Sequence, residues 1–184
     1  TVLVLGAAGG VGSAAVQVAK AAGARVVAAV SSADKAAFCT GLGADMSIDL
    51  SQQDLRGALK AAQISPDVVL DPVGGDLAEA AFRQIAWRGR YLVVGFAAGP
   101  IPALPLNLAL LKGASIVGVF WGDFARREPK AFAQGLAQLF VWYAQGAVKP
   151  AIDTKLPMTS LPEAYARMAS RRLHGKLLVV NHPL

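Results

Sequence analysis

Short, almost wholly apolar runs alternate along this chain with longer segments in which apolar residues recur every three or four positions. The short runs are typical of strands that helices cover on both faces, and the longer period is that of an amphipathic helix. The pattern predicts strands at residues 2–5, 25–30, 45–49, 68–70, 89–94 and 115–120. It predicts helices at residues 13–23, 33–41, 77–87, 106–111 and 129–145. A further helix is expected after Ser51, which would be its N-cap, with Asp54 three residues later in the capping position.

Strands that alternate with helices predict an α/β fold, a Rossmann doubly wound six-stranded parallel sheet in the order 3-2-1-4-5-6. This order puts strand 115–120 at the edge of the sheet. An apolar edge strand without charge or proline exposes unpaired backbone groups. We therefore expect Ser115 to Phe120 to pair with the same strand of a second copy, so that one sheet runs through a homodimer.

The segment from residue 149 onward has a different organisation, with an extended piece at 154–158, a helix at 161–169 and a strand at 176–180. A strand, helix and strand beyond a finished sheet need another sheet to join. We expect two units, residues 1–148 as the Rossmann domain and residues 149–184 as a tail that belongs to a second domain. Because the chain enters a strand almost at once, we also expect it to be part of a larger protein.

A glycine-rich turn joins the first strand to the first helix and is the main candidate for chemistry. Gly6 permits the tight turn, Gly9 and Gly10 allow a pyrophosphate to approach the backbone, and Gly12 allows the helix to pack on the strand. Ala8 and Val11 complete this turn. The helix N-terminus offers unpaired amides and a positive dipole end to an anion. The alternative is a tight turn that binds nothing.

The end of the second strand distinguishes between the two nicotinamide dinucleotides. NAD-binding chains usually carry an acidic residue there for the ribose hydroxyls, whereas this strand ends in Ser31 and Ser32, with Lys35 one helical turn later. Two hydroxyls and a lysine suit the 2′-phosphate of NADP. The alternative is that Ser32 is only an N-cap and Lys35 only a solvated helix residue.

Glycines also follow the fourth and fifth strands, at the same predicted sheet edge. Gly74, Gly75 and Gly95 either leave room for the ligand or serve ordinary turns. We interpret Asp71 and Asp49 at strand ends as turn-capping residues rather than an acid–base pair. His174 and His182 are interpreted as surface residues, so the sequence contains no recognisable catalytic constellation.

Composition excludes several classes of protein. The 184 residues are 54% hydrophobic and 16% charged, with a net charge of +6, but the basic residues are scattered, so nucleic acid is not an expected partner. No apolar run is long enough to span a bilayer. A single cysteine, Cys39, excludes an internal disulfide and a cysteine zinc cluster, and no other metal-ligand cluster occurs. We expect a reducing compartment, the cytoplasm or an equivalent such as the mitochondrial matrix.

Several segments together resemble the zinc-independent quinone oxidoreductases (zeta-crystallin-like) of the medium-chain dehydrogenase/reductase superfamily. The resemblance extends from the first strand to the C-terminus. The motifs are Gly6-Ala7-Ala8-Gly9-Gly10-Val11-Gly12, Ser31-Ser32-Ala33-Asp34-Lys35, Leu42-Gly43-Ala44-Asp45, Asp71-Pro72-Val73-Gly74-Gly75, Gly89-Arg90-Tyr91, Gly95-Phe96 and His174-Gly175-Lys176.

This resemblance implies NADPH as the hydride donor, a quinone or enone as the electron acceptor, and dimerisation through the last Rossmann strand. It also implies an N-terminal GroES-like catalytic domain, onto which the tail would fold. Lys35 matches the position that contacts the 2′-phosphate, whereas Asp49 and Leu50 stand where many relatives carry a tyrosine. Gly95-Phe96-Ala97 and Phe120-Trp121 match segments that line the nicotinamide in the family, and Val73 and Gly74, in the loop after the fourth strand, are further candidates for cofactor binding.

Two other functions stay open at this point. The same kind of domain serves enoyl-thioester reductases, and a non-enzymatic nucleotide-sensing or RNA-binding module would fit the basic charge. In an enzyme of either kind the hydride chemistry would be that of the cofactor, with the protein supplying orientation and electrostatics. Alone, this chain is expected to bind nucleotide and to turn over little or no substrate.

Overall fold

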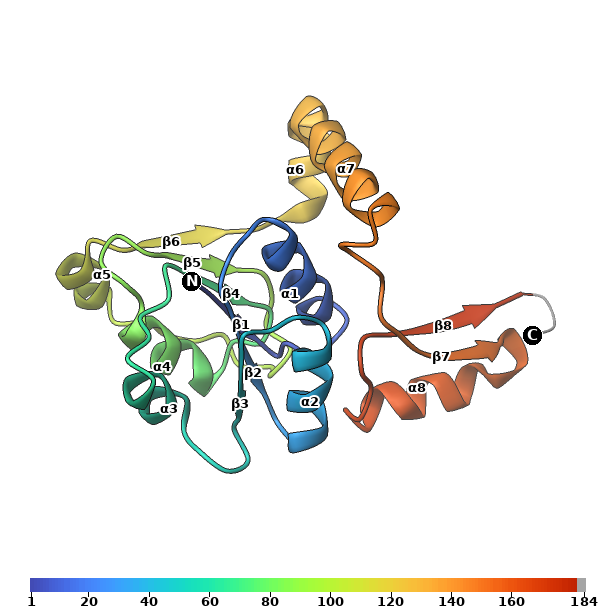
Figure 1. The fold of residues 1–184 in the computed structure, drawn as a ribbon, viewed down its shortest axis with the longest axis horizontal. Coiled ribbons are helices and arrows are strands. Elements are labelled where there is room, and N and C mark those ends of the chain that lie inside the picture. The colour runs from blue at the N-terminus through green and yellow to red at the C-terminus, as the bar shows by residue number, and fades with distance from the viewer. Residues whose placement is uncertain (182–184) are drawn as a thin grey trace.

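A computed structural model describes residues 1–181, and its centre is a six-stranded parallel sheet in the order β3-β2-β1-β4-β5-β6 (Figure 1). The predicted fold class and strand order are confirmed. In-register pairs such as Val2 with Val26 and Val2 with Val68 place β1 at the middle of the sheet. The strands are β1 (Val2–Leu5), β2 (Val26–Val30), β3 (Met46–Asp49), β4 (Val68–Asp71), β5 (Arg90–Val93) and β6 (Ser115–Gly118).

Both faces of the inner strands are buried, which explains why these strands are continuously apolar. Leu3 and Leu5 pack on one face with Phe82 and Leu59, whereas Val4 packs on the other face with Val16. Helices α3 (Leu55–Ala61), α4 (Asp76–Gln84) and α5 (Leu106–Lys112) contribute to the first core, and α1 (Gly12–Ala21) and α2 (Ala33–Gly41) to the second. Alternate residues of one strand therefore serve two separate cores.

Two helix predictions need correction, and one helix was not predicted. Asp54, not Ser51, is the N-cap of α3, and its carboxylate accepts a hydrogen bond from the amide of Gly57. Helix α4 ends at Gln84 because Ile85 takes an extended conformation (ψ 143°) and is buried in the core. Helix α6 (Trp121–Arg127) was not predicted; Asp123 pairs with Arg126 and Arg127 inside it, and Trp121 packs edge-on against Phe132 of the following helix.

A polar contact fixes the start of β2 against α1. The amide of Val26 donates to the Asp45 carboxylate at 2.7 Å, and the ammonium of Lys20 lies 2.9 Å from the same group. The amide hydrogen bond, with Lys20 beside it, lowers the pKa of Asp45 below its ordinary value. The Asp45 carboxylate is therefore negatively charged in the folded protein at neutral pH.

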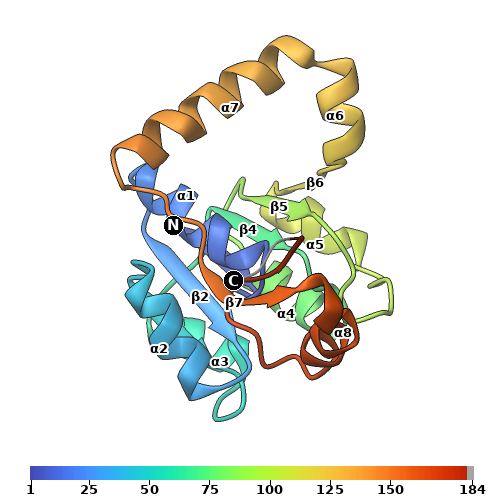
Figure 2. The same ribbon diagram turned by 90° about the vertical axis from the view of Figure 1, so that its right-hand side faces the viewer.

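Helices α6 and α7 (Pro129–Ala144) project away from the sheet and cover none of its strands (Figure 2). Large apolar side chains of α7 are exposed, among them Phe140 at 64% and Tyr143 at 59%. Within the described residues no helix has the length and apolarity that a bilayer-spanning segment needs.

The tail forms a small unit of its own. It consists of β7 (Ile152–Pro157), a 3-10 turn (Met158–Ser160), α8 (Leu161–Ala169) and β8 (Lys176–Val180), and β7 pairs with β8 in parallel. Figure 1 shows this unit beside α1 and α2. The elements match the prediction, but among the described residues these two strands make a sheet with both outer edges unpaired. His182 lies outside the described residues.

Candidate functional site

A cavity of about 710 Å³ lies at the carboxyl ends of β1, β2 and β4, where parallel α/β sheets bind ligands. The glycine turn, the end of β2 and the loop after β4 form its walls on the Rossmann side, and the tail forms another wall. The lining residues are Gly6, Ala8, Gly9, Gly10, Val11, Gly12, Ala29, Val30, Ser31, Lys35, Leu50, Pro72, Val73, Leu77, Ala97, Ala98, Met168, Arg171, Leu173, Gly175, Lys176 and Leu177.

Two glycines of the turn, Gly6 and Gly12, could not carry a side chain without strain, and several amides of the turn are free. Gly6 has a positive φ of 58°, and a Cβ on Gly12 would lie 2.3 Å from the carbonyl oxygen of Gly6. Within residues 1–181, the amides of Gly10, Val11 and Gly12 donate to no protein acceptor. They lie at the N-terminus of α1, which has no acidic residue in its first turn. The turn is thus built to bind an anion.

Three basic side chains border the cavity, and none of them forms an ion pair in the part of the chain described. Lys35 donates to the hydroxyl of Ser31 at 3.1 Å and to the carbonyl of Arg171 at 2.7 Å. The ammonium of Lys176 lies 3.1 Å from where a Cβ of Gly10 would be. The ion pairs within residues 1–181 all involve other cations. The cavity therefore presents uncompensated positive charge.

The buried carboxylate at the end of β4 has a structural role, as predicted. Asp71 accepts hydrogen bonds from the amides of Val73 and Gly74, at 2.7 and 2.8 Å, and from the hydroxyl of Tyr91. Burial, and then the contact with Asp71, raises the pKa of Tyr91 far above its ordinary value, so its hydroxyl stays protonated. Asp49 likewise accepts from the amide and hydroxyl of Ser51. Both carboxylates thus hold the backbone turns that follow their strands.

Ten of the sixteen predicted binding residues line the cavity: Gly6, Ala8, Gly9, Gly10, Val11, Gly12, Ser31, Lys35, Val73 and Ala97. Six do not line it: Ser32, Gly74, Gly95, Phe96, Phe120 and Trp121. Ser32 is the N-cap residue of α2 by backbone geometry, although its side chain makes no capping hydrogen bond. The Phe96 ring lies over Gly74. The strand ends at Gly118, so Phe120 and Trp121 belong to the exposed start of α6, at 75% and 62% exposure.

The wall that the tail supplies was missed from the sequence. Arg171 adopts a positive φ of 56°, and Lys176 follows directly after Gly175, whose amide donates to the Ala8 carbonyl at 2.8 Å. The His174-Gly175-Lys176 motif signals this part of the chain, but local patterns do not reveal that it returns to the glycine turn. His174 is also less exposed than predicted, at 27%.

No metal site is present among residues 1–181, where no group of three or more histidine, cysteine, aspartate or glutamate side chains could hold an ion. Cys39 is buried in α2, and burial raises the pKa of its thiol to about 11. The thiol is therefore protonated and unsuited to metal binding at neutral pH.

Comparison with known sequences identifies relatives along almost the whole chain. The family model described as "Zinc-binding dehydrogenase" matches residues 10–141. Quinone oxidoreductase-like protein 2 of Mus musculus is 35% identical over 182 residues, which are 97% of this chain and 52% of that protein. The chain thus spans about half the length of this relative.

Comparison with solved structures also identifies quinone oxidoreductases as similar proteins. The quinone oxidoreductase of Thermus thermophilus, which was also solved in complex with NADPH, has a TM-score of 0.84 at 30% identity, over 97% of this chain and 56% of that chain. The Escherichia coli quinone oxidoreductase complexed with NADPH has a TM-score of 0.86 at 27% identity, over the same shares of the two chains.

Proposed function

Because the chain belongs to the zinc-binding dehydrogenase family, we propose that it is the NADPH-binding part of an oxidoreductase that reduces a quinone or enone acceptor. The observation that carries this proposal is the cavity itself. A glycine turn with free amides and three unpaired cations border one cavity in the described residues. Zinc has no ligand set there, so no step is assigned to it.

The pyrophosphate of the cofactor would bind at the glycine turn. The amides of Gly10, Val11 and Gly12 are free to donate to its oxygens, and the dipole of α1 favours the negative charge. Lys176 adds a cation from the tail, with its side chain against Gly10. The protein thus offers both oriented donors and net charge to two linked phosphates.

The choice of NADPH over NADH is attributed to the end of β2. Ser31 and Lys35 line the cavity there, and among residues 1–181 no acidic side chain lines it to bind the ribose hydroxyls. Arg171 adds positive charge from the tail. These groups suit a 2′-phosphate, and the NADPH complexes of the two solved relatives support this choice.

The chemistry within the described residues is limited to binding and orientation. When bound, the reduced nicotinamide would supply the hydride. Val73, Ala97 and Ala98 give the cavity an apolar wall beyond the glycine turn, which would exclude water from the ring. No carboxylate, histidine, cysteine or tyrosine lines the cavity among residues 1–181. The proton that accompanies the hydride would therefore come from solvent or from the remainder of the enzyme.

The proposed enzyme needs more than this chain. We infer that residues 1–148 are the NADPH-binding domain and residues 149–184 a tail that completes a second, catalytic domain. The unpaired edges of the β7–β8 sheet and the exposed apolar residues of α7 support this division. They leave surface for the parts that the longer relatives contain.

We also infer a homodimer through β6. Its residues Ile116 and Val117 are 41% and 37% exposed on the open edge of the sheet. Pairing with a second copy would satisfy the unpaired backbone groups of this edge and give these side chains cross-strand neighbours. Light scattering at micromolar concentration should give twice the chain mass, and a monomer would contradict this assignment.

Fluorescence titration of this chain with NADPH and NADH tests the cofactor proposal, with saturation by NADPH at the lower concentration expected. The acceptor requires the full-length protein, with its turnover of 1,4-benzoquinone and of an enoyl-CoA compared at equal NADPH. Faster reduction of the enoyl-CoA would assign the enzyme to thioester reduction instead. Absence of NADPH binding would overturn the proposed function.

A further inference from the structure

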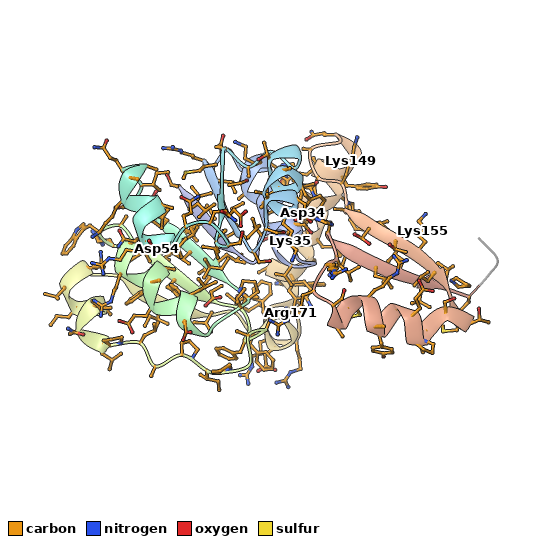
Figure 3. The ribbon with its side chains drawn as sticks, turned by 90° about the horizontal axis from the view of Figure 1, so that it is seen from below. Asp34, Lys35, Asp54, Lys149, Lys155 and Arg171 are labelled. Carbon is orange, nitrogen blue, oxygen red and sulfur yellow. The ribbon has the colours of Figure 1, made fainter. Side chains whose placement is uncertain are left out.

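The tail touches the Rossmann domain at the border of the cavity, through contacts between residues far apart in the sequence. Besides the bond from Gly175 to Ala8, the amide of Lys149 donates to the buried side chain of Gln17 at 2.7 Å. Figure 3 shows Asp34, Lys35 and Arg171 together where the two parts meet, whereas Asp54 lies on the far side of the domain. The tail side of this junction forms one wall of the cavity.

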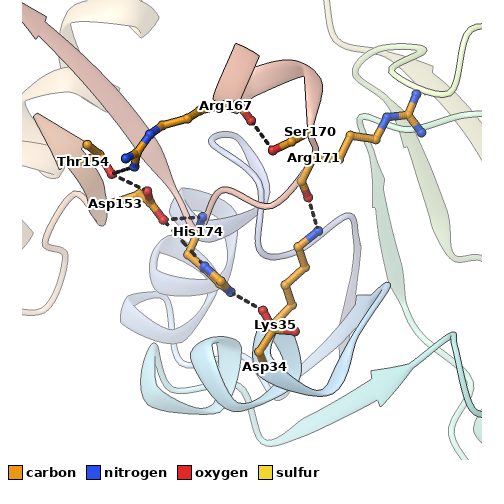
Figure 4. A network of polar contacts seen from close by, with 8 residues as sticks. All are labelled: Asp34, Lys35, Asp153, Thr154, Arg167, Ser170, Arg171 and His174. Carbon is orange, nitrogen blue, oxygen red and sulfur yellow. Dashed lines mark hydrogen bonds and ion pairs between the residues drawn. The ribbon is translucent and has the colours of Figure 1, made fainter. Parts of the chain in front are cut away.

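His174 links the two parts directly. Its Nε2 lies 3.0 Å from the carboxylate of Asp34 on α2, and its own amide donates to Asp153 of β7 at 3.0 Å. The imidazole also contacts the Phe38 ring edge-on, with 5.2 Å between ring centroids. Figure 4 shows the imidazole between the two carboxylates, one from each part. The side chain is thus held from both sides of the junction.

A second link runs beside the first. The ammonium of Lys35, on the same helix turn as Asp34, donates to the carbonyl of Arg171 in the tail. Figure 4 shows that the Arg171 side chain extends away from Lys35, so the guanidinium is free of this contact. We call the contacts of Asp34 and Lys35 with His174 and Arg171 the clasp.

We propose that His174 and Asp34 are positioning residues, which hold the tail so that Arg171 and Lys176 face the phosphates of the cofactor. This proposal rests on the proposed function. It adds that cofactor binding and docking of the tail are coupled, because the cofactor would contact both parts at once. Coupling between two equilibria is reciprocal: a docked tail raises cofactor affinity, and bound cofactor holds the tail in place.

The contacts that hold the tail on the Rossmann domain are few and weak, which makes docking of the tail sensitive to the cofactor. Asp34 is 65% exposed and His174 27% exposed, so their interaction is partly screened by water and is modest by itself. A tail that depends on a few such contacts opens locally more readily than the core. A dinucleotide that bridges Lys176 and the glycine turn would add contacts across the junction.

Amide hydrogen exchange of the ligand-free chain tests the clasp without any cofactor. The variants are His174→Ala, which removes the imidazole, His174→Gln, which keeps a side-chain donor, and Asp34→Asn. Glu79→Gln is the matched control, since it neutralises an exposed carboxylate that pairs with Arg83 on α4. His174→Ala should speed exchange of the Gly175 and Lys149 amides about three- to tenfold and leave strand β1 unchanged, with His174→Gln restoring part of the protection.

Titration with NADPH tests the coupling. His174→Ala should weaken NADPH binding about three- to tenfold, and Asp34→Asn should add little once the histidine is gone, because both remove the same contact. In the wild-type chain, NADPH should slow exchange of the Gly175 amide.

Exchange and affinity within twofold of wild type in His174→Ala would overturn the proposal. Faster exchange with unchanged NADPH affinity would also overturn it, since the tail would then dock without serving the cofactor. A wild-type chain that fails to bind NADPH would remove the proposed function and the coupling. Exchange of the ligand-free chain would still decide whether His174 holds the tail.

Discussion

Replacement of Lys35 by alanine should weaken the binding of NADPH more than the binding of NADH. The ammonium donates to Ser31 and to the carbonyl of Arg171, pairs with no carboxylate among residues 1–181, and lies at the border of the cavity. It therefore retains a donor and a full charge for a phosphate. Of the two cofactors, only NADPH carries a phosphate on the 2′-hydroxyl of the adenosine ribose.

The size of the effect follows from the type of contact. A hydrogen bond between charged groups contributes ~1.5–3 kcal/mol, and screening by solvent at this border reduces it to about 1–2 kcal/mol. The dissociation constant for NADPH should rise roughly 5- to 30-fold at low salt. The dissociation constant for NADH should rise only about two- to threefold, because Lys35→Ala also removes one contact that holds the tail.

Fluorescence titration of wild type and Lys35→Ala with both cofactors measures these changes. Lys60→Ala is the matched control, since it removes a cation from the last turn of α3, away from the cavity lining. At about 0.5 M salt the NADPH effect should shrink, as expected for a screened charge pair. An equal loss for NADPH and NADH, or the same loss in Lys60→Ala, would refute the phosphate role.

Three further variants test the structure around the cavity. Gly12→Ala puts a Cβ 2.3 Å from a carbonyl oxygen of the glycine turn, so it should lower the free energy of unfolding, measured in urea, by ~1–3 kcal/mol. Gly135→Ala is its control, because this glycine of α7 has open space around it and the substitution should not destabilise the chain. Tyr91→Phe removes a buried donor to Asp71 and should cost ~1–3 kcal/mol in the same assay; a change below about 0.3 kcal/mol would contradict the bond. The pKa of Asp45 is lower in the folded chain than in the unfolded chain, where it is about 4. The contribution of Asp45 to the free energy of unfolding is therefore fully present above the unfolded pKa and is lost as the pH falls through the folded pKa. The stability difference between wild type and Asp45→Asn should therefore be constant above about pH 5 and disappear in acid, and a pH-independent difference would contradict the shift.

Much of the Rossmann sheet was predictable because its strands are buried on both faces, and burial of this kind leaves a continuous apolar run. The turn before α1 was predictable for a similar reason, since its glycines respond to close backbone contacts within a few residues. The errors occurred where local signals compete. Ser51 and Asp54 are both good N-caps, and the helix begins after Asp54, which directly precedes the buried Leu55.

The tail wall of the cavity was beyond prediction from local patterns. Arg171 and Lys176 lie more than a hundred positions from the glycine turn, and their sequence neighbourhood indicates only a helix end and a strand. What brings them to the site is the docking of the tail, through Lys35, Ala8 and Gln17. Hydrogen bonds between such distant residues leave no periodic trace in the sequence.

Titration of this chain with NADPH, followed by nicotinamide fluorescence, tests most directly whether the cavity beside the glycine turn binds a dinucleotide phosphate. We predict saturable one-to-one binding, with a weaker dissociation constant for NADH and loss of binding in Gly12→Ala. No saturation at millimolar NADPH in the folded wild-type chain would contradict binding at this cavity.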